Sequence, residues 1–229
     1  MKKIHIFICF VFVTIICFSL TIFPAIGAVV NETESPTAES IRSLAEQGDS
    51  AAQFELGSMY SSGINVQQNY DEAVRWYRKA AEQGEARAQF ELGAMYYDGI
   101  GLSRKYSEAM KWYLKAAEQG ESRAQFNLGV MYSSGKGVSK SYEEAVKWYR
   151  RAASQGKASA QHNLGIMYFN GQGVKRNYDE AYFWLILSSL AGDKKYIADR
   201  DKAEEKLSLD GASAVQKRAA ELNKRMNDQ

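Results

Sequence analysis

The sequence predicts an all-α fold, a solenoid of stacked helix pairs, and two observations carry this prediction. The chain from Asp49 to Gly192 divides without gaps into four blocks of 36 residues, 49–84, 85–120, 121–156 and 157–192. A period of this length is typical of helical repeat arrays. All four tryptophans share one block position, and a Met-Tyr pair recurs at another. The tryptophans are Trp76, Trp112, Trp148 and Trp184, and the pairs begin at Met59, Met95, Met131 and Met167.

Residues 1–28 have the organisation of a secretory signal peptide. Lys2 and Lys3 precede an apolar run from Ile6 to Phe23, after which come a proline and small residues, as before a cleavage site. The run exceeds the roughly 7–15 residues of most signal cores and is within the roughly 17–25 that span a bilayer, so an uncleaved anchor remains the alternative. Whether or not the segment is cleaved, its positively charged end, with Lys2 and Lys3, stays in the cytoplasm. We therefore expect the rest of the chain to be exported, either periplasmic or secreted, or held at the inner membrane by the anchor.

Two short segments connect this leader to the repeats. Residues 29–38 are expected to form a linker. Residues 39–48 end in Ala45-Glu46-Gln47-Gly48, which matches the end of a block. They predict a half-repeat at the front of the array.

The first half of each block predicts a helix, near Ala51 to Ser61 in the first block. Ala52, Leu56 and Met59 recur at spacings that place them on one helical face. Gly57 lies inside this helix and has a counterpart in every block, although a glycine there costs about 1 kcal/mol relative to alanine. We therefore expect the backbone of another helix to pass close to it.

The second half of each block predicts a helix with its own start signal. Good N-cap residues precede it in three blocks, each with a glutamate three residues later, which resembles a capping box. The caps are Asn69, Ser141 and Asn177, whereas the second block has the poor cap Lys105. Trp76, Tyr77 and their neighbouring alanines form the expected buried stripe, and the helix should end at a glycine such as Gly84.

The fourth block differs at its end, where Phe183 to Leu187 and Leu190 replace charged positions of the earlier blocks. A helix that is apolar on all sides must be covered on all sides. The cover is expected from residues 193–229, with capping helices near 194–207 and 212–225.

These patterns resemble a known family, the Sel1-like repeat, which is related to the tetratricopeptide repeat. The third block carries the resemblance in Ala124-Gln125-Phe126, Leu128-Gly129, Met131-Tyr132, Gly135-Lys136-Gly137-Val138, Ala145, Trp148, Tyr149, Ala152, Ala153 and Gly156. A small departure is Asn65, which replaces the second loop glycine in the first block. The resemblance implies a right-handed α-α superhelix that serves as an adaptor for protein partners.

Composition argues against catalysis and metal binding. Both cysteines, Cys9 and Cys17, lie in the N-terminal segment, and His162 is the one histidine after residue 28. A Ser-His-Asp triad would need His162, yet it stands where the other blocks have phenylalanine, so we interpret it as a surface residue of the repeat. Without Lys2 and Lys3 the 29 basic residues become 27, equal to the 27 acidic ones, which does not favour nucleic-acid binding. We expect no enzyme, cofactor or metal site.

Candidate binding residues follow from the resemblance to the tetratricopeptide repeat. Its partner-binding groove corresponds to positions 3, 6, 10, 13 and 14 of each block. The positions are Arg87, Phe90, Ala94, Tyr97 and Asp98, then Arg123, Phe126, Val130, Ser133 and Ser134, then Ser159, His162, Ile166, Phe169 and Asn170. Their spacing makes one stripe along the first helices, and aromatic side chains beside arginine are common interface anchors. The alternative is that the phenylalanines only pack between repeats.

The expected function is therefore that of an exported scaffold, which binds a protein or peptide partner in the groove of the first helices. Contact with a membrane is expected only through the N-terminal segment, if it stays uncleaved. The alternative of another class is a small-ligand or cell-wall-fragment binder with weak hydrolase activity.

Overall fold

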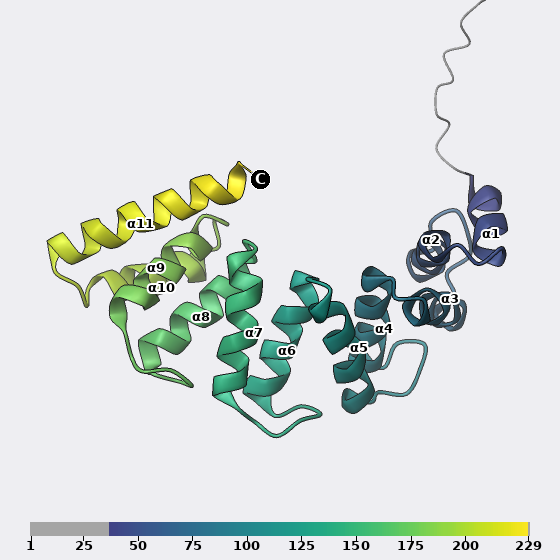
Figure 1. Ribbon diagram of the computed structural model, residues 1–229, viewed down its shortest axis with the longest axis horizontal. Helices are drawn as coiled ribbons and strands as arrows, with labels where there is room; N and C mark the ends of the chain where they lie inside the picture. Colours follow the sequence, from purple (N-terminus) through teal and green to yellow (C-terminus); the bar gives the residue numbers. More distant parts are fainter. Residues whose placement is uncertain (1–36, 229) are drawn as a thin grey trace, which may run out of the picture. The chain divides into compact units, whose positions relative to one another are not determined.

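The computed structural model describes residues 37–228, and the regular structure in this part of the chain is helical throughout. The helices pack in chain order within one compact unit (Figure 1). They are α1 (Ala38–Glu46), α2 (Ser50–Ser62), α3 (Tyr70–Glu82), α4 (Ala86–Asp98), α5 (Tyr106–Glu118), α6 (Ser122–Ser134), α7 (Tyr142–Ser154), α8 (Ala158–Asn170), α9 (Tyr178–Ser189), α10 (Lys194–Glu204) and α11 (Leu209–Asn227). The predicted all-α solenoid is confirmed for these residues. The predicted signal peptide or anchor lies outside them.

Successive helices alternate between two roles. The first helices α2, α4, α6 and α8 pack along their second helices α3, α5, α7 and α9, and each second helix then packs against the next helix in the chain. Helix α1 packs on α2 as a second helix would. No helix within residues 37–228 combines the length and apolar character needed to cross a bilayer.

Loop glycines set the turn inside each pair. Gly63 ends α2 with a left-handed φ of 74°, and its N–H donates to the carbonyl of Met59 at 2.8 Å. Asn65 has a left-handed φ of 63°, close to the 66° of its counterpart Gly101. Asparagine tolerates this region better than most residues, which explains why it can replace the glycine.

The second helices begin as predicted, with one correction. The side chains of Asn69, Ser141 and Asn177 accept hydrogen bonds from first-turn amides, and Lys105 makes no such bond. The reciprocal half of a capping box is not formed, however. The N–H of Asn69 donates instead to the carbonyl of Tyr60 at 2.9 Å, so it is already satisfied by the first helix.

The mid-helix glycines admit a side chain of the paired helix. A Cβ at Gly57 would lie 2.7 Å from the Tyr77 ring, and a Cβ at Gly93 equally close to the Tyr113 ring. At Gly165 the nearest atom belongs to Leu185. The expectation of a close approach is confirmed, but the nearest atoms belong to a side chain rather than to a helix backbone.

The tryptophans vary in burial although their block position is fixed. Trp76 and Trp184 are buried, whereas Trp112 and Trp148 are only partly buried. Trp112 packs against the core formed by α3 and α4, and the amino group of Lys115 lies 4.4 Å from the centre of its ring. The fully buried residue at this point is its neighbour Tyr113.

A ladder of buried glutamines joins the pairs, and the sequence did not single it out. Gln89 donates to the carbonyl of Ala81 at 3.1 Å, near the end of α3, where helical carbonyls lack an internal partner. Gln119 in turn donates to the side-chain oxygen of Gln89 at 2.8 Å. The ladder consists of Gln53, Gln89, Gln125 and Gln161.

The C-terminal helices cover α9 as expected. Both α10 and α11 pack against α9, and Gln216 of α11 donates to the hydroxyl of Tyr182 at 2.8 Å. Leu190 is the exception, because it caps the end of α9 and stays 60% exposed rather than covered.

Candidate functional site: a groove along the first helices

A cavity of about 360 Å³ opens between α4 and α6, within the stripe predicted from the sequence. It is lined by Phe90, Ala94, Tyr97, Asp98, Tyr113, Phe126, Asn127 and Val130. Most of the predicted groove residues of the second repeat, and two of the third, therefore lie together around one hollow. Tyr113 and Asn127 line it as well but were not predicted. Tyr113 shares the block position of the recurrent tyrosine on the second helix, which the sequence assigned only to the core.

A smaller cavity of about 210 Å³ lies between α6 and α8. Tyr149 and Ile166 occupy places in it that correspond, one repeat later, to Tyr113 and Val130 in the first cavity. Ser133, another predicted groove residue, also lines it. The groove thus holds two hollows at the same register in consecutive repeats.

Aromatic rings form the walls and floor of the first cavity. Phe90 lies against Tyr113 with ring centres 5.7 Å apart, and Phe126 lies against Tyr149 at 5.8 Å. Burial raises the pKa of Tyr113 far above its ordinary value. Tyr113 therefore stays neutral at physiological pH, and as an almost fully buried residue it forms the floor of the cavity.

Arg87 and Arg123 lie beside the groove but are engaged within the protein. The Arg123 guanidinium lies 4.2 Å from the centre of the Phe90 ring and pairs with Glu121 at 3.0 Å and Glu91 at 3.1 Å. Arg87 stacks in the same way on Phe54, at 4.3 Å. These arginines therefore connect neighbouring repeats, and we do not expect them to orient a partner.

The carboxylate of Glu91 shows how closely the contact between the second and third repeats is packed. Burial raises the pKa of Glu91, although the guanidinium of Arg123 acts in the opposite direction. Arg123 uses three nitrogens on two glutamates, so few donors remain for a ligand.

The arginine junction is missing between the third and fourth repeats. Ser159 replaces the arginine there, and Lys157 replaces the glutamate that begins the helix. Within residues 37–228 no cationic group lies over the Phe126 ring. One face of Phe126 is therefore free of the cover that Phe54 and Phe90 have.

His162 has a different environment from the one predicted. It is 4% exposed, stacks on Tyr196 of α10 at 4.3 Å between ring centres, and its Nε2 lies 2.9 Å from Asp199. The interpretation of His162 as a surface residue is wrong, because α10 covers it. His162 fixes the cap and does not line the open groove.

The last two predicted residues lie away from both cavities. Phe169 packs edge-on against Tyr178 with ring centres 5.3 Å apart. Asn170 is exposed at the end of α8. Neither residue lines a cavity of the groove.

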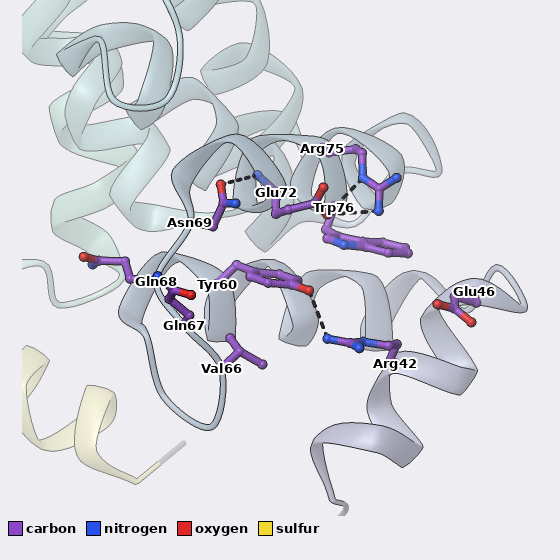
Figure 2. A pocket seen from close by; sticks show the side chains of 10 residues that line it. All are labelled: Arg42, Glu46, Tyr60, Val66, Gln67, Gln68, Asn69, Glu72, Arg75 and Trp76. Carbon is purple, nitrogen blue, oxygen red and sulfur yellow. Dashed lines mark hydrogen bonds and ion pairs between the residues drawn. The ribbon is translucent and has the colours of Figure 1, made fainter.

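A larger cavity, of about 720 Å³, lies outside the groove between α1, α3 and the loop that joins α2 to α3 (Figure 2). Its polar side chains largely satisfy one another. Arg42 donates to the hydroxyl of Tyr60 at 3.0 Å, and Arg75 pairs with Glu72 at 2.9 Å. The Trp76 ring has Arg75 and Lys79 over it, so it offers no open face for a sugar. Sequence reasoning missed this cavity, because its residues are spread over three helices and a loop.

Within residues 37–228 no three His, Cys, Asp or Glu side chains come close enough to hold a metal ion. The candidate site is therefore a surface groove lined by rings, amide groups and one acidic side chain. Such a surface suits the binding of another molecule rather than acid–base or metal chemistry.

The stacked pairs and the groove define a helical repeat protein of the kind that binds partners on its surface. The family comparison makes this specific: the Sel1 repeat model matches residues 50–85, 86–121, 122–157 and 158–193. The chain belongs to the Sel1 repeat family, whose members are in general protein-interaction scaffolds and typically not enzymes. No curated protein matches the chain.

Two solved structures support the same assignment. A Sel1 repeat protein from Oxalobacter formigenes is 36% identical over 80% of this chain and 76% of its own, with a TM-score of 0.68. The protective antigen c5321 of uropathogenic Escherichia coli, which displays an SLR fold, is 32% identical over 83% of this chain, with a TM-score of 0.52. This chain covers 50% of the length of c5321.

Proposed function

We propose that the protein is an exported scaffold that binds a peptide segment of a partner protein along the groove of its first helices. The observation that carries the proposal is the pair of cavities at the same register in consecutive repeats. A linear peptide can place successive apolar side chains in successive hollows of this kind, as in other groove-binding modes. Phe126 lines the first cavity, with no cation of residues 37–228 over its ring, and we expect it to act as an aromatic anchor.

The experiment fills the cavity without removing core atoms. Val130→Trp would occupy the hollow between α4 and α6, since Val130 is only partly buried and lines it. The full chain would be incubated with envelope extract, and captured proteins would be crosslinked and identified. We expect the wild type to capture a defined partner and Val130→Trp to lose it.

The matched control is Ser58→Trp. Ser58 holds the same block position in the first repeat but lines neither groove cavity. Capture that survives Val130→Trp, in a protein with an unchanged circular dichroism spectrum, would place the binding site elsewhere.

A small-ligand binder is the second candidate, because the cavity of about 720 Å³ has the size of a small-molecule site. A thermal shift with soluble cell-wall fragments tests it. A rise in the unfolding temperature that Glu72→Gln abolishes would favour this candidate over the scaffold.

A further inference from the structure

The loops inside the four helix pairs carry a strongly biased set of charges. We define the loop edge as residues 63–69, 99–105, 135–141 and 171–177. It contains six basic residues and no acidic residue, although the whole chain is nearly balanced at 29 basic and 27 acidic. The basic residues are Arg104, Lys105, Lys136, Lys140, Lys175 and Arg176. All six are exposed.

These cations are not neutralised by ion pairs. None of the six pairs with an acidic side chain within residues 37–228, whereas Glu108 and Glu144 pair with lysines on their own helices. Lys136 instead donates to the hydroxyl of Tyr97 at 3.0 Å, and Lys140 lies 4.6 Å from the centre of the Tyr142 ring. A cation over a ring keeps its charge available to an outside anion.

Some carboxylates do follow the loops. Asp71, Glu143 and Asp179 lie in the first turns of the second helices, where they also favour the helix dipole. With Glu72, Glu108, Glu144 and Glu180, seven acidic residues lie in these first turns, so the cations lie on the loops and the carboxylates on the helix turns behind them.

Apolar side chains share the same edge. Ile64 is 62% exposed, and Ile100 at the same block position is 40% exposed. Tyr70, at the end of the first loop, is also 40% exposed. Of the six most exposed large apolar side chains within residues 37–228, two thus lie in the loop edge and a third, Tyr70, directly follows it.

Each loop after the first lies close to the residue that directly follows the preceding loop. A Cβ at Gly101 would lie 2.7 Å from the backbone of Tyr70, and a Cβ at Gly137 equally close to the backbone of Tyr106. Each loop therefore rests on the residue that begins the second helix of the preceding repeat. The loop edge presents isoleucines from the first two loops and cations from the last three.

We propose that the loop edge binds the surface of a membrane that contains anionic phospholipids. Unpaired lysines and arginines attract anionic head groups, and exposed isoleucine and tyrosine side chains enter the boundary between head groups and acyl chains. A soluble polyanion would use the cations but would leave the isoleucines in water. This surface is distinct from the groove and goes beyond the scaffold function.

The test reports the position of the loops directly, whether or not the N-terminal segment also enters the bilayer. In the full chain, Cys9→Ser and Cys17→Ser leave a single cysteine introduced by Ser139→Cys, which carries an environment-sensitive fluorophore. Vesicles of phosphatidylcholine alone are compared with vesicles that contain phosphatidylglycerol. We expect a blue shift only with the anionic vesicles, and no shift when the fluorophore is at Ser213→Cys on α11.

Charge variants then identify the surface. The combination Lys136→Gln, Lys140→Gln, Lys175→Gln and Arg176→Gln should weaken the fluorescence response on the order of tenfold or more in lipid concentration. The matched control changes four exposed lysines outside the loop edge, Lys194, Lys206, Lys217 and Lys224, to glutamine and should leave the response unchanged.

Two further experiments distinguish a membrane surface from a soluble polyanion as the ligand. Ile64→Ser with Ile100→Ser should weaken the response to anionic vesicles several-fold. A DNA duplex and polyglutamate, added at equal charge, should displace the protein poorly. Equal shifts with neutral and anionic vesicles, indifference to the isoleucine change, or full displacement by either polymer would overturn the proposal.

Discussion

The aromatic residues at two neighbouring block positions do not contribute equally to stability. Tyr113 is 1% exposed and fills the space beside Gly93, whereas its neighbour Trp112 is only partly buried. Tyr113→Ala should lower the free energy of unfolding by about 3–5 kcal/mol, as for other large aromatic side chains in a core. Trp112→Ala should cost roughly half as much, since it opens a smaller cavity. Urea unfolding of the two variants checks the order, and a larger loss for Trp112→Ala would contradict it.

The glutamine ladder gives a second prediction at this scale. Gln125 donates to the carbonyl of Ala117 at 3.1 Å and accepts from Gln155 at 2.8 Å. Gln125→Leu would remove both bonds, although the Ala117 carbonyl still accepts from the N–H of Gly120 at 3.1 Å. We therefore expect a cost of about 0.5–1.5 kcal/mol for each hydrogen bond lost.

Gln161 is the matched control for this change. Its donation to Ala153 is kept, but Ala191 stands where the other blocks have the second glutamine. Gln161→Leu should therefore cost less than Gln125→Leu in the same unfolding experiment. Equal losses would mean that the contact between glutamines adds little.

At the scale of the elements, α10 is held to α8 by a charged contact. Hydrogen bonds from His162 and Lys202 lower the pKa of Asp199, although burial acts to raise it. A lowered pKa in the folded protein stabilises the fold above the unfolded pKa, about 3.9. This contribution is lost as the pH falls through the folded value.

Asp199→Asn should therefore be less stable than the wild type at pH 7, and the difference should shrink below about pH 4. Thermal unfolding of the variant and the wild type at pH 7 and below about pH 4 measures this difference in stability. Asp201→Asn is the control, because Asp201 is half exposed and pairs only with the adjacent Arg200. A difference that is constant with pH would show that Asp199 acts through packing alone.

Much of the element structure was predictable because it depends on local signals. The caps at Asn69, Ser141 and Asn177 and the turn glycines such as Gly63 act within a few residues, so a repeated sequence displays them directly. The reciprocal capping bond was not predictable. The amide that it needs is taken by the carbonyl of Tyr60. Spacing within one helix does not reveal a competitor on another.

The same distinction holds for the candidate site. The period of the repeats placed Phe90, Tyr97 and Phe126 on one stripe, and the structure gathers them around one cavity. The environment of His162 depends on Tyr196 and Asp199, which belong to a helix outside the repeat pattern. No comparison among blocks could have shown that contact.

At the scale of the whole molecule, export remains a prediction. A reporter fused after residue 229 should be active outside the cytoplasm, because Lys2 and Lys3 keep the N-terminal end inside. Mass spectrometry of the purified protein should find an N-terminus near Ala28 or Val29. Recovery of intact residues 1–28 in the membrane fraction would establish the anchor instead, and a reporter active only in the cytoplasm would contradict export.

The missing arginine between the third and fourth repeats has a consequence for how the binding specificity of such a protein can evolve. Ser159 leaves the Phe126 ring without the arginine that Phe54 and Phe90 have, yet the buried alanine, leucine and methionine of the first helices are the same in each repeat. A single exchange at this position can therefore cover or uncover one aromatic ring of the groove. An array of this kind can acquire a new binding partner by altering one surface residue per repeat, because the core of the first helices does not have to change with it.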